Sequence, residues 1–181
     1  MPGFVALLKG VNVGRSNRVP MAELGALLEA LGCTKVRTLL NSGNAIFLSR
    51  TGGPRVHAER IHRELALRLG VDVPVIVKSA KQIADIVAGN ILAAQTTDAS
   101  RLLVAFTSDA KSLENLDALA SLVKSPERLH LGEHAAYLWC HDGILQSKAG
   151  SALLGKFGQA ATTRNWATVL KIRAMLCDTA A

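Results

Sequence analysis

Apolar residues in the first part of the chain alternate between the short runs of strands and the three-to-four-residue spacing of helices. Four runs have the composition of strands: residues 4–9, 36–40, 45–48 and 73–77. Two stretches have helical spacing, and each begins with a proline and is followed by a glycine: residues 20–31 and 54–69. The order β-α-β-β-α-β predicts a ferredoxin-like, or split βαβ, subdomain over residues 1–78.

Residues 79–181 repeat this pattern less regularly. Ser79 and Gln82 match a capping box that opens a helix, and Asp109 is placed to cap another. Strand patterns occupy three ranges: residues 102–107, 128–131 and 135–141. Two helices are predicted to close the chain: residues 152–157 and 163–177. No clear fourth strand is evident in this half, and the fold class we predict is α+β, with two ferredoxin-like subdomains, antiparallel sheets and packed helices.

The composition is that of a globular protein. Of its 181 residues, 49% are hydrophobic and 19% are charged, so a sizeable core is available for one domain or two small subdomains. No uncharged run approaches the ~18 residues that span a bilayer, which predicts no membrane partner. The apolar patch at residues 4–8 lacks the basic flank of a signal peptide, so we expect a cytoplasmic location. Three widely spaced cysteines without a CxxC pair are typical of reduced thiols.

The formal net charge of +7 is concentrated in two stretches at opposite ends of the sequence. Residues 1–22 carry three cations, residues 143–177 carry five, and neither stretch contains an acid. All other positions together hold 13 cations and 14 anions. Clustered cations repel one another unless water or an anion screens them, so we expect the fold to bring both ends to one anionic ligand.

Residues 9–21 combine a strand end, a loop and a helix start, an arrangement that binds phosphates in many α/β proteins. Unpaired N–H groups and the helix dipole favour an anion there. Arg15 and Arg18 would add positive charge, and Asn12 and Asn17 neutral donors. The loop matches neither GxxxxGK[ST] nor GxGxxG, so nucleotide binding by those mechanisms is not supported. The alternative is that both asparagines stabilise turns through backbone bonds, while both arginines are merely solvated.

In the predicted C-terminal helix, Asn165 falls on the apolar stripe, with Arg164 and Lys171 on the opposite, basic stripe. An unsatisfied buried amide costs about 1–3 kcal/mol, so Asn165 is either a structural clamp or a site residue. The predicted ligand-binding residues are Asn12, Arg15, Asn17, Arg18, Asn41, Ser42, Asn44, Lys148, Arg164, Asn165 and Lys171. We expect residues 10–20 to meet residues 161–171.

No residue pattern identifies a reaction. Ser147 with Lys148, and Cys140 with His141, are neighbours in extended segments, so their side chains point to opposite sides and cannot act as nucleophile and base. The histidines lack the spacing of zinc ligands, so we predict no metal site and no cofactor. The basic stretches contain no carboxylate pair for acid–base catalysis. Catalytic residues, and whether the protein is an enzyme, stay unassigned, as does the oligomeric state.

Nucleic acid is the first alternative ligand, because the isoelectric point is about 9.7 and RNA-binding sheets share this topology. Such sheets stack bases on surface aromatic residues, yet only 4% of this chain is aromatic. Phe4 and Phe47 are the candidates on the sheet, without an RNP-type run, which leaves binding through backbone phosphates. The second alternative is a structural or partner-binding module without catalysis.

Three separated motifs, GVNVGRSNRVPM, NSGN and TTRNWATVLK, resemble the family catalogued as domain of unknown function 1697, over essentially the whole chain. The resemblance implies two linked α/β subdomains of ferredoxin-like type and no established biochemical role. Two positions depart from the family pattern: Arg15 stands where a second glycine is usual, and Asn41 where glutamine is common. Arginine disfavours the left-handed backbone that glycine permits, so no glycine-dependent shape is expected at Arg15.

Overall fold

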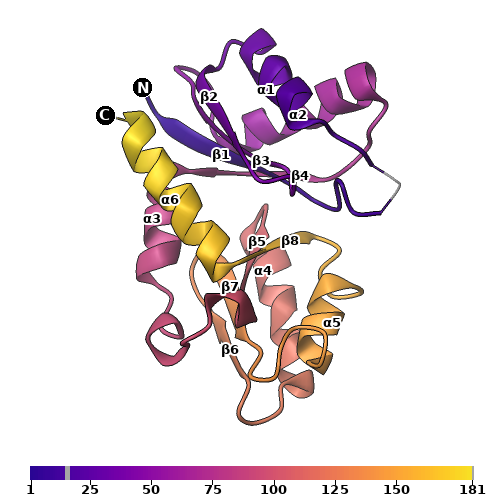
Figure 1. The fold of residues 1–181 in the computed structure, drawn as a ribbon, viewed down its shortest axis with the longest axis vertical. Helices are drawn as coiled ribbons and strands as arrows, with labels where there is room; N and C mark the ends of the chain where they lie inside the picture. Colours follow the sequence, from indigo (N-terminus) through magenta and orange to yellow (C-terminus); the bar gives the residue numbers. More distant parts are fainter. Residues whose placement is uncertain (15–16, 181) are drawn as a thin grey trace. The chain divides into compact units, whose positions relative to one another are not determined.

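The computed structural model describes residues 1–14 and 17–180, and the chain divides into two compact units (Figure 1). The first unit comprises Met1–Ile83 together with the residues from Ile172 onward. The second unit comprises Ala84–Lys171. Each unit contains one four-stranded sheet, and each is described by itself below.

The first unit contains an antiparallel sheet in the order β2-β3-β1-β4. Its elements follow one another as β1 (Gly3–Leu8), α1 (Met21–Ala30), β2 (Thr34–Leu39), β3 (Asn44–Leu48), α2 (Pro54–Leu69) and β4 (Val75–Ser79). This order is the split βαβ arrangement. All four strands and both helices predicted here are confirmed, with ends within two residues of the prediction.

The second unit repeats this order as β6-β7-β5-β8 in another antiparallel sheet. The remaining elements are α3 (Ala80–Ala88), β5 (Leu102–Thr107), α4 (Ala110–Glu114), β6 (Arg128–Leu131), β7 (Ala135–Trp139), α5 (Lys148–Leu154), β8 (Ala161–Asn165) and α6 (Trp166–Ala180). Three 3-10 helices complete the chain: Ala93–Gln95, Ala99–Arg101 and Asn115–Leu122. The predicted α+β fold with two ferredoxin-like subdomains is confirmed.

The strand β8 lies where the sequence pattern predicts the first residues of a helix over 163–177. Residues 161–165 instead pair with β5, with Arg164 opposite Val104, and α6 begins only at Trp166. The prediction is wrong at this point because helical spacing was extended through two adjacent threonines, which favour strands. The run is also too short and too polar to be recognised as a strand from its apolar pattern.

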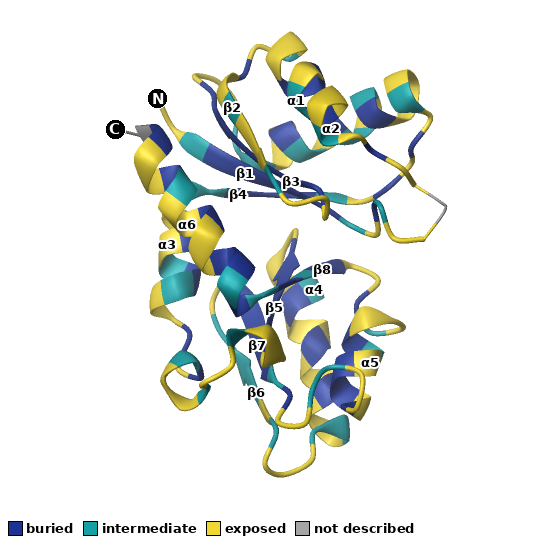
Figure 2. Ribbon diagram, viewed as in Figure 1, coloured by how far each residue is buried: buried dark blue, intermediate teal, exposed yellow. Residues whose placement is uncertain are grey.

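The central strand β1 is buried on both faces. Phe4, Ala6 and Leu8 pack with α1 and α2 in one core, and Val5 and Leu7 between them are fully buried as well. Figure 2 shows this strand almost entirely in the colour of buried residues. A strand buried on both faces requires a continuous apolar run in place of alternation, and the sequence FVALL supplies it.

In the second unit, helices pack on one face of the sheet as α1 and α2 do in the first (Figure 1). Leu103 and Ala105 of β5 share a core with Leu113 of α4, Leu116 of the following 3-10 helix and Leu153 of α5. The two units therefore have separate helix-covered cores built on the same plan.

The C-terminal part of α6 packs within the first unit. A Cβ added to Gly3 would lie 3.6 Å from both Ala80 and Leu176. Lys35 Nζ donates a hydrogen bond of 3.2 Å to the carbonyl of Thr179, where a cation is favoured by the negative end of the helix dipole. None of the helices within the described part of the chain has the length and apolar character needed to cross a membrane.

Side-chain caps fix the starts of α3 and α5. Ser79 Oγ accepts from the Gln82 N–H at 3.2 Å, and Gln82 Oε1 accepts from the Ser79 N–H at 3.0 Å, which confirms the predicted capping box. Ser147 Oγ accepts from the Gly150 N–H at 2.9 Å. Because of this cap, α5 begins at the next residue, and the helix predicted over residues 152–157 is displaced toward the N-terminus.

His57 lies inside the first core, against the rings of Phe4 and Phe47. Its ring centroid is 4.7 Å from that of Phe4 and 5.2 Å from that of Phe47, and the residue is 2% exposed. Within the described residues, its Nε2 atom has no hydrogen-bond partner. Burial and the positive charge of Arg60 lower the pKa of His57 from its usual 6.5, against the opposing effect of a hydrogen bond to the Thr51 backbone.

We predict that the free energy of unfolding falls as the pH is lowered below about 6.5, because the unfolded chain then binds a proton at His57 more readily than the folded chain does. The contribution of neutral, buried His57 to the free energy of unfolding is complete above the pKa of the unfolded state. It is lost as the pH falls through the lowered pKa of the folded state. His57→Phe removes the titrating group and is expected to flatten the dependence, measured by urea unfolding at about pH 8, 6.5 and 5.

Phe4→Leu is the control, because it loosens the same aromatic cluster and keeps His57. It should lower the free energy of unfolding at every pH and preserve the wild-type slope. Parallel pH curves for the wild type and His57→Phe would contradict the prediction.

Candidate functional site

The loop between β1 and α1 is closed by the side chain of Asn12. Its Nδ2 donates to the carbonyls of Val19 and Asn41, at 2.8 and 2.7 Å, and its Oδ1 accepts from the Val19 N–H at 2.9 Å. Asn12 and Asn17 have left-handed φ angles of 58° and 51°, which asparagine tolerates better than most residues. Both amide hydrogens of Asn12 are therefore used to build the loop, as the turn-stabilising alternative supposes.

The turn between β2 and β3 packs against this loop. Gly43 has a φ of 77°, and a Cβ there would lie 2.6 Å from a methyl group of Val11, so the position requires glycine. The buried Asn44 donates through Nδ2 to the last carbonyl of β2 and to Ser42 Oγ, at 2.9 and 3.0 Å. Together with the bridge from Asn12, these contacts hold the loop and the turn as one structure.

A pocket of about 340 Å³ opens where the loop meets the turn. The residues that line it are Asn12, Gly14, Arg18, Val19, Pro20, Met21 and Asn41. Arg18 and Asn41 are exposed, and they bring a cation and an amide to the pocket. None of these described lining residues carries a carboxylate, a thiol or an imidazole, so the pocket offers positive charge and hydrogen bonds without a general base.

The helix α1 begins at this pocket, and its N-cap residue is Pro20, which provides no side-chain cap. Its first hydrogen bond runs from the Leu24 N–H to the Pro20 carbonyl, at 3.0 Å. The N–H groups of residues 21–23 therefore have no acceptor in the helix, and they carry the positive end of its dipole. Glu23 in the first turn offsets part of that charge. Because Pro20 and Met21 line the pocket, an anion held by Arg18 would lie near these N–H groups.

The equivalent connection in the second unit is built differently. Only Ser108 and Asp109 separate β5 from α4. The Asp109 carboxylate accepts from the N–H and the hydroxyl of Ser112, at 2.8 and 2.9 Å, which confirms the predicted cap. Hydrogen bonds from Ser112 and Ser108 hold the pKa of Asp109 below its ordinary value. A carboxylate of the chain itself therefore occupies the start of α4.

Two residues of the second basic stretch have structural roles. Arg164 is only 8% exposed in β8, and it donates to Thr162 Oγ1 and the Thr163 carbonyl at 2.9 and 2.7 Å. Burial lowers its pKa to about 10, so it stays charged at neutral pH. Asn165 accepts from the Thr168 N–H at 2.9 Å and caps α6. Their placement on opposite stripes of a helix is wrong, because both precede the helix.

The structure thus separates the roles of the predicted site residues. Arg18 and Asn41 line the pocket; the side chains of Asn12 and Asn44 stabilise the loop and turn, and Ser42 accepts from Asn44. Asn17 Nδ2 lies 3.5 Å from the Gly10 carbonyl. Lys148 and Lys171 are exposed in the second unit, and Arg15 lies outside the described residues. A site shared by both basic stretches stays a prediction.

Four residues line the pocket in addition to those predicted to bind a ligand: Gly14, Val19, Pro20 and Met21. The sequence does indicate these positions, because the last residues of a loop that leads into a helix lie beside the helix N-terminus. Side-chain chemistry alone did not reveal them, since their contribution comes from backbone and shape.

All of the net charge belongs to the first unit. It holds 13 of the 21 lysines and arginines and 6 of the 14 aspartates and glutamates, whereas the second unit holds eight of each. Of the C-terminal basic stretch only Arg173 belongs to the first unit. The net positive charge, which lies at the two ends of the sequence, therefore belongs to one unit of the structure, and the other unit is neutral overall.

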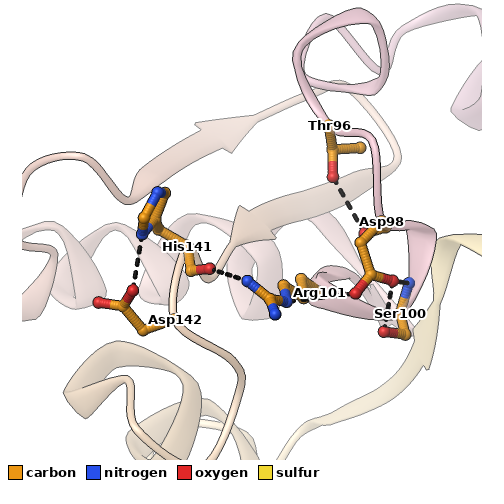
Figure 3. A network of polar contacts seen from close by, with 6 residues as sticks. All are labelled: Thr96, Asp98, Ser100, Arg101, His141 and Asp142. Carbon is orange, nitrogen blue, oxygen red and sulfur yellow. Dashed lines mark hydrogen bonds and ion pairs between the residues drawn. The ribbon is translucent and has the colours of Figure 1, made fainter.

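A second polar cluster lies at the start of β5 (Figure 3). Asp98 accepts from the N–H and hydroxyl of Ser100 and pairs with Arg101 Nε at 3.2 Å. Arg101 also donates to the His141 carbonyl at 2.6 Å, and His141 Nδ1 lies 2.7 Å from an Asp142 carboxylate oxygen. These groups bond mainly to one another and tie β5 to the segment after β7. Among the residues described, no group of three or more His, Cys, Asp or Glu side chains could hold a metal ion.

We predict that Asn165 acts as a helix cap and not as a contact to an anion. Asn165→Ala should lower the free energy of unfolding by about 1 kcal/mol, because it removes the acceptor for Thr168. Asn165→Asp should match or exceed the wild type, because its carboxylate accepts the same bond and favours the helix dipole. Urea unfolding at neutral pH measures both. Equal losses in the two variants would contradict the capping role.

Comparison with known proteins agrees with this architecture. The family described as "Protein of unknown function (DUF1697)" matches residues 1–137. Among solved structures, the conserved bacterial protein SP0830 from Streptococcus pneumoniae is similar, with 26% sequence identity and a TM-score of 0.80, over 97% of this chain and 98% of that chain. No curated protein matches. Because the match includes most of the chain, this protein belongs to the DUF1697 family of proteins of unknown function.

Proposed function

We propose that the first unit binds a small phosphate-bearing anion in the pocket between the β1–α1 loop and the β2–β3 turn. One observation carries this proposal: Arg18, Asn41 and the uncapped start of α1 border a single pocket in the unit that holds all of the net charge. Arginine can donate two parallel charge-assisted bonds to a phosphate, and the backbone N–H groups of a helix start are suited to its remaining oxygens.

The proposal concerns binding and not a reaction. The described lining residues include no group that could abstract a proton or attack a substrate at neutral pH. The side chain of the lining residue Asn12 uses its amide for hydrogen bonds within the fold. A ligand at this site would therefore be recognised by charge and hydrogen bonding.

Sequence-independent nucleic-acid binding is the rival function, and the charge of the first unit favours it. Base stacking on the sheet does not, because Phe4 and Phe47 are buried against His57 in the core beneath α1 and α2. Nucleic-acid binding would therefore have to rely on contacts to backbone phosphates alone. Such binding weakens steeply with salt, in proportion to the number of phosphates neutralised.

We predict that Arg18→Ala weakens the binding of inorganic phosphate and pyrophosphate by about 10- to 150-fold, the equivalent of a lost charged hydrogen bond of about 1.5–3 kcal/mol. The melting temperature should stay the same, because an exposed cation contributes under about 1 kcal/mol to stability. Isothermal titration calorimetry and thermal unfolding measure the two effects.

Arg63→Ala is the matched control, because it removes the same charge from an exposed position of α2 in the same unit. Arg63 is not among the residues that line the pocket, and salt screens exposed charges, so the affinity should change by less than about twofold. Equal losses in both variants, together with tight and strongly salt-dependent binding of single-stranded DNA, would support the rival. Absence of binding to every anion would leave a structural or partner-binding module.

A further inference from the structure

The strand β6 lies at one edge of the second sheet, with β7 as its neighbour (Figure 1). In the hairpin that joins the two strands, the Gly132 N–H donates to the Ala135 carbonyl at 2.9 Å. Hydrogen-bonded and non-hydrogen-bonded pairs alternate along an antiparallel ladder, so His130 is hydrogen-bonded to β7. The backbone N–H and carbonyl groups of Leu129 and Leu131 therefore point away from the sheet.

These outward backbone groups are open to a further strand. Within the described part of the chain, neither a backbone group nor a side chain forms a hydrogen bond with them on this side. Leu129 and Leu131 each present one donor and one acceptor, spaced as an added antiparallel strand requires.

The equivalent edge of the first sheet is protected against such pairing. The strand β2 has a register shift between Thr34 and Arg37, and Lys35 within it has a left-handed φ of 49°. Bulges and edge lysines are two means by which sheets prevent the addition of a strand. The register of β6 is continuous from Arg128 to Leu131, and the strand contains no lysine. Both protections of β2 are therefore missing from β6.

The side chains of β6 alternate between the two faces of the sheet. Leu129 and Leu131 pack against the helix-covered core. On the other face, His130 stacks on Tyr137 at 5.7 Å between ring centroids, and the Tyr137 hydroxyl donates to the Ile86 carbonyl of α3 at 2.6 Å. Opposite residues of an antiparallel pair point to the same face, so an added strand would need space for side chains on both faces.

Two adjoining pockets provide this space. The smaller, of about 400 Å³, includes apolar residues from the 3-10 helix region on one face and from the segment after α3 on the other: Ala120, Val123, Ile91 and Leu92. The larger, of about 560 Å³, includes Trp139 and Arg128. Both pockets are lined by Gln95, Glu127 and Arg128, so they form one groove along the start of β6.

Charge distinguishes a different chain from a second copy of this one. If β6 paired with itself so that both leucines of each copy were bonded, His130 would face His130, and Glu127 would face Glu133 of the other copy. Like charges directly opposite one another destabilise a sheet. A strand with cations opposite Glu127 and Glu133 would instead be attracted at both of its ends.

We propose that β6 binds an extended segment of another protein, which adds an antiparallel strand to the edge of the second sheet. The segment carries β-branched residues opposite Leu129 and Leu131, where each pair exchanges two backbone hydrogen bonds. It carries lysine or arginine opposite Glu127 and Glu133. The site lies in the second unit and is independent of the proposed anion pocket.

An acetylated and amidated peptide of sequence KTVTVEK tests the proposal in the full chain. Its residues would lie, in order, opposite Glu133, Gly132, Leu131, His130, Leu129, Arg128 and Glu127. At saturation, amide hydrogen exchange at Leu129 and Leu131, followed by NMR, should slow by at least about tenfold. The amides of β2 are the internal control and should not change.

A charge-reversed peptide, ETVTVKE, tests the complementarity. It should bind at least about fivefold more weakly than KTVTVEK, because three attractive cross-strand charge pairs become repulsive. The same NMR titration gives both affinities.

Methylation of the peptide backbone tests the hydrogen bonds without altering the protein. A methyl group on the nitrogen of the first valine, opposite Leu131, blocks an N–H that faces β6 and should weaken binding by at least about tenfold. The matched control is methylation of the central threonine, opposite His130, whose N–H faces away from β6. That peptide should retain its affinity within about threefold.

Leu131→Pro tests the same edge from the side of the protein. Edge strands tolerate proline where the N–H faces outward, so the variant should keep the wild-type pattern of amide signals and lose most of its affinity for KTVTVEK. Leu131→Ala is the control, because it loses the same leucine packing and keeps the N–H. Its affinity should stay within about threefold of the wild type.

Four results would overturn the proposal: absence of KTVTVEK binding, equal affinity for ETVTVKE, equal effects of the two methylations, and dimers of the chain alone that already protect the Leu129 and Leu131 amides. Sedimentation velocity detects such dimers, which would identify a second copy as the occupant. Because the probes carry no phosphate and the site lies in the second unit, none of these results bears on anion binding by the first unit.

Discussion

The candidate site depends on one amide group, that of Asn12. Val19 is fully buried where the loop enters α1, so its backbone N–H and carbonyl both need partners away from water. The Asn12 side chain supplies both, as a neighbouring strand would, and its second amide hydrogen reaches the β2–β3 turn. Two segments far apart in the sequence are thereby joined at the place where the pocket opens.

The two units show that this fold does not require a particular distribution of charge. Their strand orders are the same, yet one unit carries the whole net charge and the other is neutral. On α2, Glu59 and Glu64 pair with arginines one turn away. The Arg55–Glu59 pair is exposed, and exposed pairs add little to stability. The two acids of that helix are thus matched locally, whereas Arg60 and Arg63 of α2 and cations elsewhere in the unit contribute to its excess of positive charge.

Sequence patterns located the first unit well because its strands and helices follow the periods that burial imposes. FVALL marks a strand buried on both faces, and the proline starts and glycine ends mark the helices. The pattern does not predict β8, because Thr162 and Arg164 of this strand are polar residues and yet are buried. Asn165 was consequently assigned to a helix face, although it caps the helix. At the site, the residue types indicate Arg18. Only the coordinates show that the Asn12 amide bonds to backbone groups and that Leu40 has a left-handed φ of 56°.

The same structural problem has two solutions in this chain. In each unit the first strand of the sheet leads to a helix whose N-terminal N–H groups need acceptors. After β5 the connection is two residues long, and Asp109 provides the acceptor from within the chain. After β1 the connection is long, and Pro20 precedes the helix in the position that Asp109 has before α4, without a side chain that could accept a hydrogen bond. A short, capped connection is enough to join a strand to a helix, as β5 and α4 show. The longer loop after β1 places Arg18 and a pocket at the helix start, where under the proposed function an anion from outside the chain would take the position that Asp109 has in the second unit.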